Sequence, residues 1–253
     1  MKLNRYLPLL IPSLVFALGQ LYFFKPKLIF LSAVLILLLL FFVVWQFGRS
    51  STVDSRWWNY LILPALSSSG LIAYSVFLSN KPVIQLLFFL NLLFLYFYLR
   101  YVYYYLLMPS AYQAFSIENI SSGVDWLAFF LVAATVYGLQ SFLNWPTGYL
   151  MLVILAAAAL LVYQVIWVNK IDFKISLSYI LISCLLLVEL GWSISFLPFN
   201  YNVAGLILAI CYYVIIGLVK NHLLDKLDIG KVKIYLILGG GSLLLILFTA
   251  KWI

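Results

Sequence analysis

Nine runs of apolar residues, each long enough to cross a lipid bilayer, take up almost all of this 253-residue chain. A hydrocarbon core about 30 Å thick requires about 20 residues of α-helix, so nine spans with short connections account for the whole length. Only two charged residues, Arg100 and Glu189, lie clearly inside these runs. The pattern predicts an all-α fold, a polytopic transmembrane helical bundle in which residues 1–253 form a single integral membrane domain.

The composition excludes an ordinary soluble protein. Hydrophobic residues make up 66% of the chain and charged residues 9%, whereas about a quarter of the residues in soluble domains are charged. The net charge of +8 does not indicate nucleic-acid binding, because the basic residues lie beside the ends of the runs rather than in one patch. Cys184 and Cys211 lie within apolar runs, where a thiol behaves as a small hydrophobic group, so we expect neither a disulfide framework nor a metal site.

Turn-forming and charged residues separate the apolar runs and set the boundaries of the predicted spans. All eight tryptophans lie in a connection or tail, or within about six residues of a span end, where indole prefers the membrane interface. The ninth run is short, so eight spans are an alternative. The predicted spans are 7–24, 28–47, 57–79, 83–107, 124–143, 148–168, 175–197, 203–219 and 234–250.

The distribution of lysine and arginine predicts the orientation. With nine alternating spans, ten basic residues lie on the side of the N-terminus and four on the other. The first group is Lys2, Arg5, Arg49, Arg56, Lys170, Lys174, Lys220, Lys226, Lys231 and Lys233, and the second is Lys25, Lys27, Lys81 and Lys251. Because cytoplasmic loops carry the excess of basic residues, we expect a cytoplasmic N-terminus, in a bacterial cytoplasmic (inner) membrane.

Two cytoplasmic connections carry local signals. At the end of the connection 108–123, Ser122 and Asp125 match a capping box that would open the fifth span. In residues 220–233 leucines alternate with charged residues, which predicts a short amphipathic helix lying in the membrane interface.

Glu189 is the first candidate functional residue, because an acidic side chain at bilayer depth costs a few kcal/mol and usually faces a cavity, a partner or a pathway. It lies about 21 Å along its span from the inner end, in the outer half of the bilayer. Four other polar residues fall at about 18 to 24 Å, counted in the same way. The predicted substrate-binding set is Glu189, Asn91, Gln140, Gln20 and Ser69.

The same residues allow a purely structural interpretation. Each amide or hydroxyl can join one pair of helices by a hydrogen bond, and a protonated Glu189 can bond to a neighbour. Arg100 lies about 11 Å from the inner end of its span among tyrosines, where its guanidinium can extend to the cytoplasmic interface. The alternative for Arg100 is an interface contact or an ion pair with Glu189, which would have to bridge roughly 10 Å of depth.

The sequence contains no P-loop, no paired acidic metal motif, no Cys/His ligand spacing and no Ser/His/Asp set at a plausible depth. We therefore assign no catalytic residue, metal or cofactor, and a non-enzyme is favoured. The first hypothesis is transport of a small molecule or lipid through an outer-half cavity around Glu189. The alternatives are a non-catalytic membrane subunit or scaffold that holds a partner protein, and an intramembrane enzyme. The expected partners are the lipid bilayer and a membrane protein or a second copy of the chain.

Overall fold

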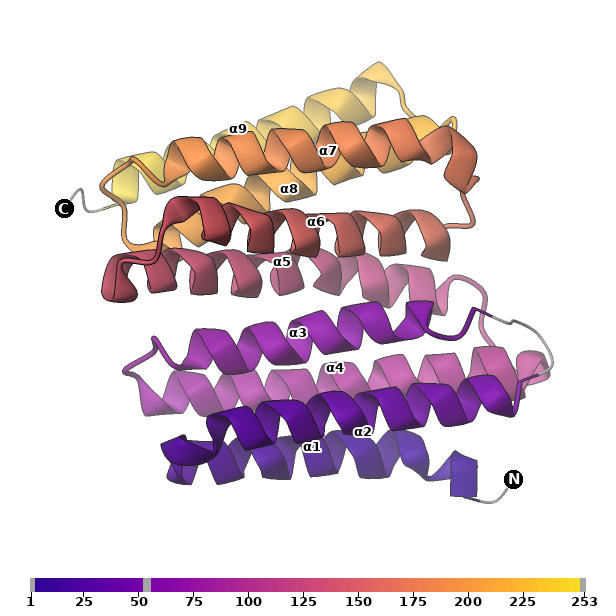
Figure 1. The fold of residues 1–253 in the computed structure, drawn as a ribbon. Coiled ribbons are helices and arrows are strands. Elements are labelled where there is room, and N and C mark those ends of the chain that lie inside the picture. Colours follow the sequence, from indigo (N-terminus) through magenta and orange to yellow (C-terminus); the bar gives the residue numbers. More distant parts are fainter. Residues whose placement is uncertain (1–2, 52–55, 251–253) are drawn as a thin grey trace. The chain divides into compact units, whose positions relative to one another are not determined.

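The computed structural model describes residues 3–51 and 56–250. Within these ranges the chain forms nine α-helices and no strand, which confirms the predicted helical bundle (Figure 1). Short 3₁₀ turns lie at Leu3–Arg5, Pro26–Leu28 and Pro109–Ala111. The helices are α1 (Leu7–Phe24), α2 (Ile29–Arg49), α3 (Asn59–Ser75), α4 (Lys81–Leu107), α5 (Ser116–Leu143), α6 (Thr147–Val168), α7 (Phe173–Ile194), α8 (Tyr201–Leu223) and α9 (Ile229–Thr249).

Eight of the helices in the described ranges are long and apolar enough to cross a membrane. The exception is α3, whose 17 residues give a length of about 25 Å. Tighter turns, with hydrogen bonds to the residue three positions earlier, extend it at both ends. Asn59 N donates to Arg56 O before the helix, and Leu78 N donates to Ser75 O after it. Helical turns therefore continue over residues 56–78, close to the predicted third span.

The chain divides into two compact units, Met1–Ser121 and Ser122–Ile253. In the first unit α1 packs against α2 and α4, α2 packs against α3 and α4, and α3 packs against α4. Its core contains Leu40, Leu63, Leu95 and Tyr98, all fully buried. The hydroxyl of Tyr98 donates to Tyr60 O at 3.1 Å, so the polar end of this buried ring is satisfied.

In the second unit α6 packs against α7, α7 against α8, and α8 against α9. α5 lies antiparallel against α8, because Ala134 is next to Gly205 while the earlier Phe129 stacks on the later Tyr212 with ring centroids 4.5 Å apart. A Cβ atom at Gly205 would lie 2.7 Å from both the Cα and the N of Ala134. Glycine at this position therefore permits a close approach of the two backbones.

The predicted capping box at Ser122 and Asp125 is wrong. α5 begins at Ser116, so both residues lie inside the helix. The hydroxyl of Tyr112 accepts a hydrogen bond from Ile117 N at 3.3 Å and donates to Glu118 Oε2 at 3.2 Å. Tyr112 thus satisfies one of the unpaired N–H groups at the true helix start, which leaves Asp125 free to take another role.

The predicted amphipathic helix in residues 220–233 is also wrong. α8 continues to Leu223 and α9 begins at Ile229, which leaves only residues 224–228 between them. The Asp228 carboxylate accepts from Lys231 N at 2.6 Å and caps α9. The charged residues of this segment therefore belong to the ends of two long helices.

Candidate functional site

Three of the predicted site residues, Gln20, Ser69 and Asn91, lie in the first unit, and each has a local partner. Gln20 and Gln85 form a reciprocal pair of amide hydrogen bonds between α1 and α4, with N···O distances of 2.5 and 3.0 Å. Ser69 Oγ donates to Ala65 O of its own helix at 2.7 Å. The Gln20–Gln85 pair thus joins two helices, whereas the Ser69 hydroxyl is satisfied within its own helix.

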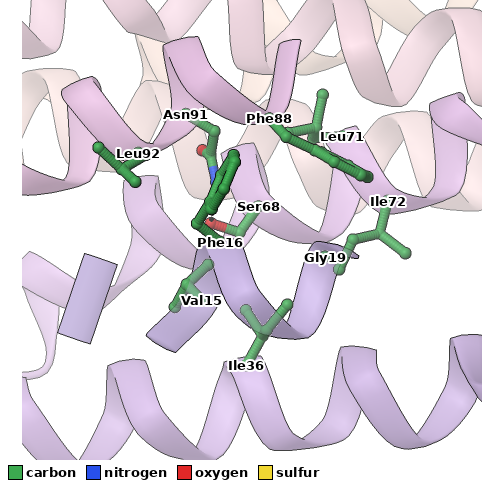
Figure 2. Close-up of a pocket in the computed structure, with 10 residues that line it drawn as sticks. All are labelled: Val15, Phe16, Gly19, Ile36, Ser68, Leu71, Ile72, Phe88, Asn91 and Leu92. Atoms are coloured by element: carbon green, nitrogen blue, oxygen red, sulfur yellow. Dashed lines mark hydrogen bonds between the residues drawn. The ribbon is translucent and has the colours of Figure 1, made fainter. Parts of the chain in front are cut away.

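Asn91 lines a cavity together with a second polar residue, Ser68 of α3. Its Nδ2 donates to Ser68 Oγ at 3.3 Å, and Figure 2 shows the two side chains pointing toward each other between apolar groups. The cavity has a volume of ≈ 10 Å³ and is lined mainly by apolar residues such as Val15, Phe16 and Ile36. It has room for about one water molecule, which is too small for a substrate.

The other two predicted residues, Gln140 and Glu189, lie in the second unit with different surroundings. Gln140 Nε2 donates to Ser195 O at 3.4 Å, which joins α5 to the end of α7. Glu189 is exposed, and its carboxylate has no hydrogen-bond or ion-pair partner among the described residues of its own unit. Gly191, two residues later and about 200° around the helix, packs against Ile154 instead. The outer-half cavity around Glu189 stays a prediction.

Arg100 is exposed on α4 and is held by two tyrosines of the same helix. Nη1 donates to Tyr96 OH at 2.8 Å and Nε donates to Tyr104 OH at 3.3 Å. The guanidinium carbon also lies 5.8 and 5.6 Å from the two ring centroids, within the range of cation–π attraction. The predicted tyrosine surroundings agree with these contacts, and the ion pair with Glu189 stays a prediction.

The strongest site in the structure is one that sequence reasoning missed, a cavity of ≈ 80 Å³ inside the second unit. We call it the Asp125 pocket. α5 contributes one face with the spacing i, i+3, i+4, and α8 contributes a face with the spacing i, i+4, i+8. α6 and α9 add one residue each. The lining residues are Ser122, Asp125 and Trp126 of α5, Tyr212, Tyr213, Ile216, Gly217 and Lys220 of α8, Val165 of α6 and Tyr235 of α9.

Two buried polar atoms that belong to lining residues have no hydrogen-bond partner within the described residues. Asp125 is 4% exposed and its Oδ1 is unpaired, and Tyr212 is 2% exposed and its hydroxyl is unpaired. A buried polar atom without a partner costs about 1 to 3 kcal/mol, and a charged group costs more. The pocket therefore presents an acidic acceptor and a hydroxyl that a bound group would satisfy.

Polar residues near the start of α5 and the end of α8 form the mouth of the pocket. Lys220 Nζ donates to Ser122 Oγ at 3.2 Å, which extends the antiparallel register of the two helices. Asn221 Nδ2 donates to Tyr235 OH at 3.3 Å, and the Tyr235 ring lies against Gly217, where a Cβ atom would collide with it. A positive charge and hydroxyl groups thus lie at the mouth, while the carboxylate lies deeper.

The sequence contained a signal for this site. Ser122, Asp125, Trp126 and the more deeply placed Phe129 share one helical face, and Tyr212 and Lys220 do so on α8. No group of three His, Cys, Asp or Glu residues in the described part of the chain is arranged to hold a metal ion.

Comparison with known proteins adds the family but no activity. Neither the curated proteins nor the solved structures include a match to this chain. Residues 11–249, nearly the whole chain and both structural units, match a family described as "Protein of unknown function (DUF5656)". This integral membrane helical bundle therefore belongs to the DUF5656 family.

Proposed function

We propose that this membrane protein binds a ligand that carries a primary ammonium group, and that it does so in the Asp125 pocket as part of small-molecule or lipid transport. The observation that carries the proposal is the unpaired Oδ1 of Asp125, a buried acceptor that lines a cavity. Transport was expected around Glu189, but Glu189 is exposed whereas Asp125 is 4% exposed. Asp125 is therefore the better candidate.

The chemistry of the lining favours an ammonium ligand. A carboxylate removed from water is stabilised by a positive charge that also donates hydrogen bonds. Trp126, Tyr212 and Tyr235 line the same cavity, and the faces of such rings attract cations. The Tyr212 hydroxyl can accept a second N–H of the same group, because it has no partner of its own.

The size of the pocket restricts the ligand. A volume of ≈ 80 Å³ accommodates a few water molecules, or an ammonium group with one or two carbon atoms. A larger solute would fit only if most of it stayed outside the mouth. The proposed ligand therefore inserts a small amine-bearing end.

The test is thermal unfolding of the purified protein in detergent during titration with ethylammonium chloride. A ligand that binds the folded state raises the unfolding midpoint in a saturable way. We expect this rise in the wild type and in Glu189→Gln, which removes the other membrane acid, but not in Asp125→Asn. Sodium chloride at equal ionic strength is the salt control.

Tyr212→Phe provides a second variant if Asp125→Asn does not fold. It removes only an unpaired hydroxyl, so the fold should persist while ethylammonium binds several-fold more weakly. Equal saturable shifts in the wild type and both variants, or no saturable shift in the wild type, would refute the proposal.

A second candidate function, a scaffold for a partner protein, is favoured by the exposed Glu189. An unpaired acidic side chain on the outer surface of a membrane helix is costly, and a donor or basic group on a partner helix would satisfy it. A photoreactive amino acid at position 189, activated in native membranes, should then give a discrete protein adduct. Adducts to lipid alone would contradict the scaffold function.

A further inference from the structure

The Asp125 pocket has an acidic side chain at one level and a basic side chain at another. Ser122 and Asp125 lie three residues apart on one face of α5, so they are separated by about 4.5 Å along the helix axis. Lys220 lies at the level of Ser122, because its Nζ donates to Ser122 Oγ. The pocket therefore has an acidic side chain at depth and a basic side chain, with a hydroxyl, one turn closer to the mouth.

A ligand that matches both levels carries an ammonium group and an anionic group about one helical turn apart. In a phosphoethanolamine group, two carbons and one oxygen separate the nitrogen from the phosphorus, a reach of roughly 4 to 5 Å with ordinary bond lengths. The ammonium would lie against Asp125 and the phosphate against Lys220 and Ser122. Lysine binds phosphate well as a point charge.

The unpaired atoms select a primary amine over a quaternary one. Asp125 Oδ1 and the Tyr212 hydroxyl both need a hydrogen-bond donor. A trimethylammonium group carries the same charge and fits an aromatic lining, but it has no N–H to donate. It would leave both atoms unsatisfied, at about 1 to 3 kcal/mol for each polar group.

The mouth lies at the depth of lipid headgroups. Lys220 is three residues from the end of α8 at Leu223, and Ser122 is six residues from the start of α5 at Ser116, which places them about 4.5 and 9 Å from the helix ends. Tyr235, which also lines the pocket, is six residues from the start of α9 at Ile229. Tyrosine and lysine prefer this boundary zone, and the basic residues predict that it faces the cytoplasm.

We propose that the Asp125 pocket holds the headgroup of an aminophospholipid from the inner leaflet, with the ammonium on Asp125 and the phosphate on Lys220. This inference rests on the proposed ammonium binding and specifies the ligand class. Only the headgroup enters, and the acyl chains stay in the bilayer. The size of the cavity and the place of its mouth both match this arrangement.

The test compares binding of four water-dispersible probes to the purified protein in detergent: dihexanoyl phosphatidylethanolamine, the corresponding phosphatidylcholine and phosphatidylglycerol, and soluble phosphoethanolamine. We expect the phosphatidylethanolamine to bind at least tenfold more tightly than the other two lipids and than phosphoethanolamine. Lys220→Gln should weaken phosphatidylethanolamine binding, because it removes the partner of the phosphate, but keep ethylammonium binding. Lys226→Gln, in the connection between α8 and α9 and outside the pocket lining, is the matched control and should bind like the wild type.

The outcomes separate this inference from the function on which it rests. If ethylammonium binds at Asp125 but the three lipids bind equally, the headgroup inference is overturned and ammonium binding stands. If phosphoethanolamine binds as tightly as the lipid, the ligand is a soluble phosphoamine and the lipid assignment is overturned. If ethylammonium itself does not bind, the proposed function fails and the inference fails with it.

Discussion

Gly205→Ala should destabilise the protein even though alanine is the better helix former. A Cβ atom at position 205 would lie 2.7 Å from two backbone atoms of Ala134, whereas ordinary van der Waals contacts begin at 3.4 Å. The backbones of α5 and α8 must therefore separate by about 0.7 Å. Overpacking of this kind costs about 1 to 3 kcal/mol, and the helix propensity of alanine returns at most about 1 kcal/mol. We expect a net loss of up to about 2 kcal/mol.

The assay is reversible unfolding by sodium dodecyl sulfate from mild detergent micelles. Gly240→Ala on α9 is the matched control, because a Cβ atom there has no neighbour within 4 Å, and it should leave the unfolding free energy unchanged or slightly higher. If Gly205→Ala is as stable as Gly240→Ala, the close contact between α5 and α8 is refuted.

Three further predictions concern other parts of the chain. Glu189→Gln should not lower the unfolding free energy by more than about 0.5 kcal/mol, because the carboxylate has no partner to lose in the described part of its unit, and a loss above about 1 kcal/mol would refute this. Burial raises the pKa of Tyr112 from 10.0 to about 12, so the folded state holds the phenolic proton more tightly and stability falls as the pH rises between these values. Tyr112→Phe should lose less stability than the wild type over that range, and parallel curves would contradict the burial. In a background without native cysteines, a cysteine at Thr147 should react with an impermeant reagent from outside and one at Asp172 should not, and the opposite labelling would reverse the predicted orientation.

The helical bundle was predictable because the apolar runs leave a membrane chain no alternative to helices. The helix ends were less predictable. α5 begins eight residues before the predicted fifth span, and α9 begins five residues before the ninth. Backbone hydrogen bonds continue a helix through polar residues at the membrane edge, whereas the apolar pattern ends there. The span boundaries taken from hydropathy therefore underestimate these helices.

The shared helical faces were visible in the sequence, but the burial of the candidate site was not predictable, because it comes from the packing of α5 against α8. Asp125 follows Ser122 by three residues at the start of an apolar run, which is also the pattern of a helix cap. Only the antiparallel packing of α5 on α8 places it in a cavity with Lys220. The hydrogen-bond partner of Gln20 could not be predicted from the sequence either, since Gln85 lies on another helix.

The most direct measurement is an experimental density map of the protein in nanodiscs of phosphatidylethanolamine. Binding of the headgroup predicts density in the Asp125 pocket with a nitrogen about 2.7 to 2.9 Å from Asp125 Oδ1, the distance of a charge-assisted hydrogen bond. The phosphate density should lie beside Lys220. A Lys220 Nζ bonded directly to the Asp125 carboxylate, with only water in the rest of the cavity, would contradict it.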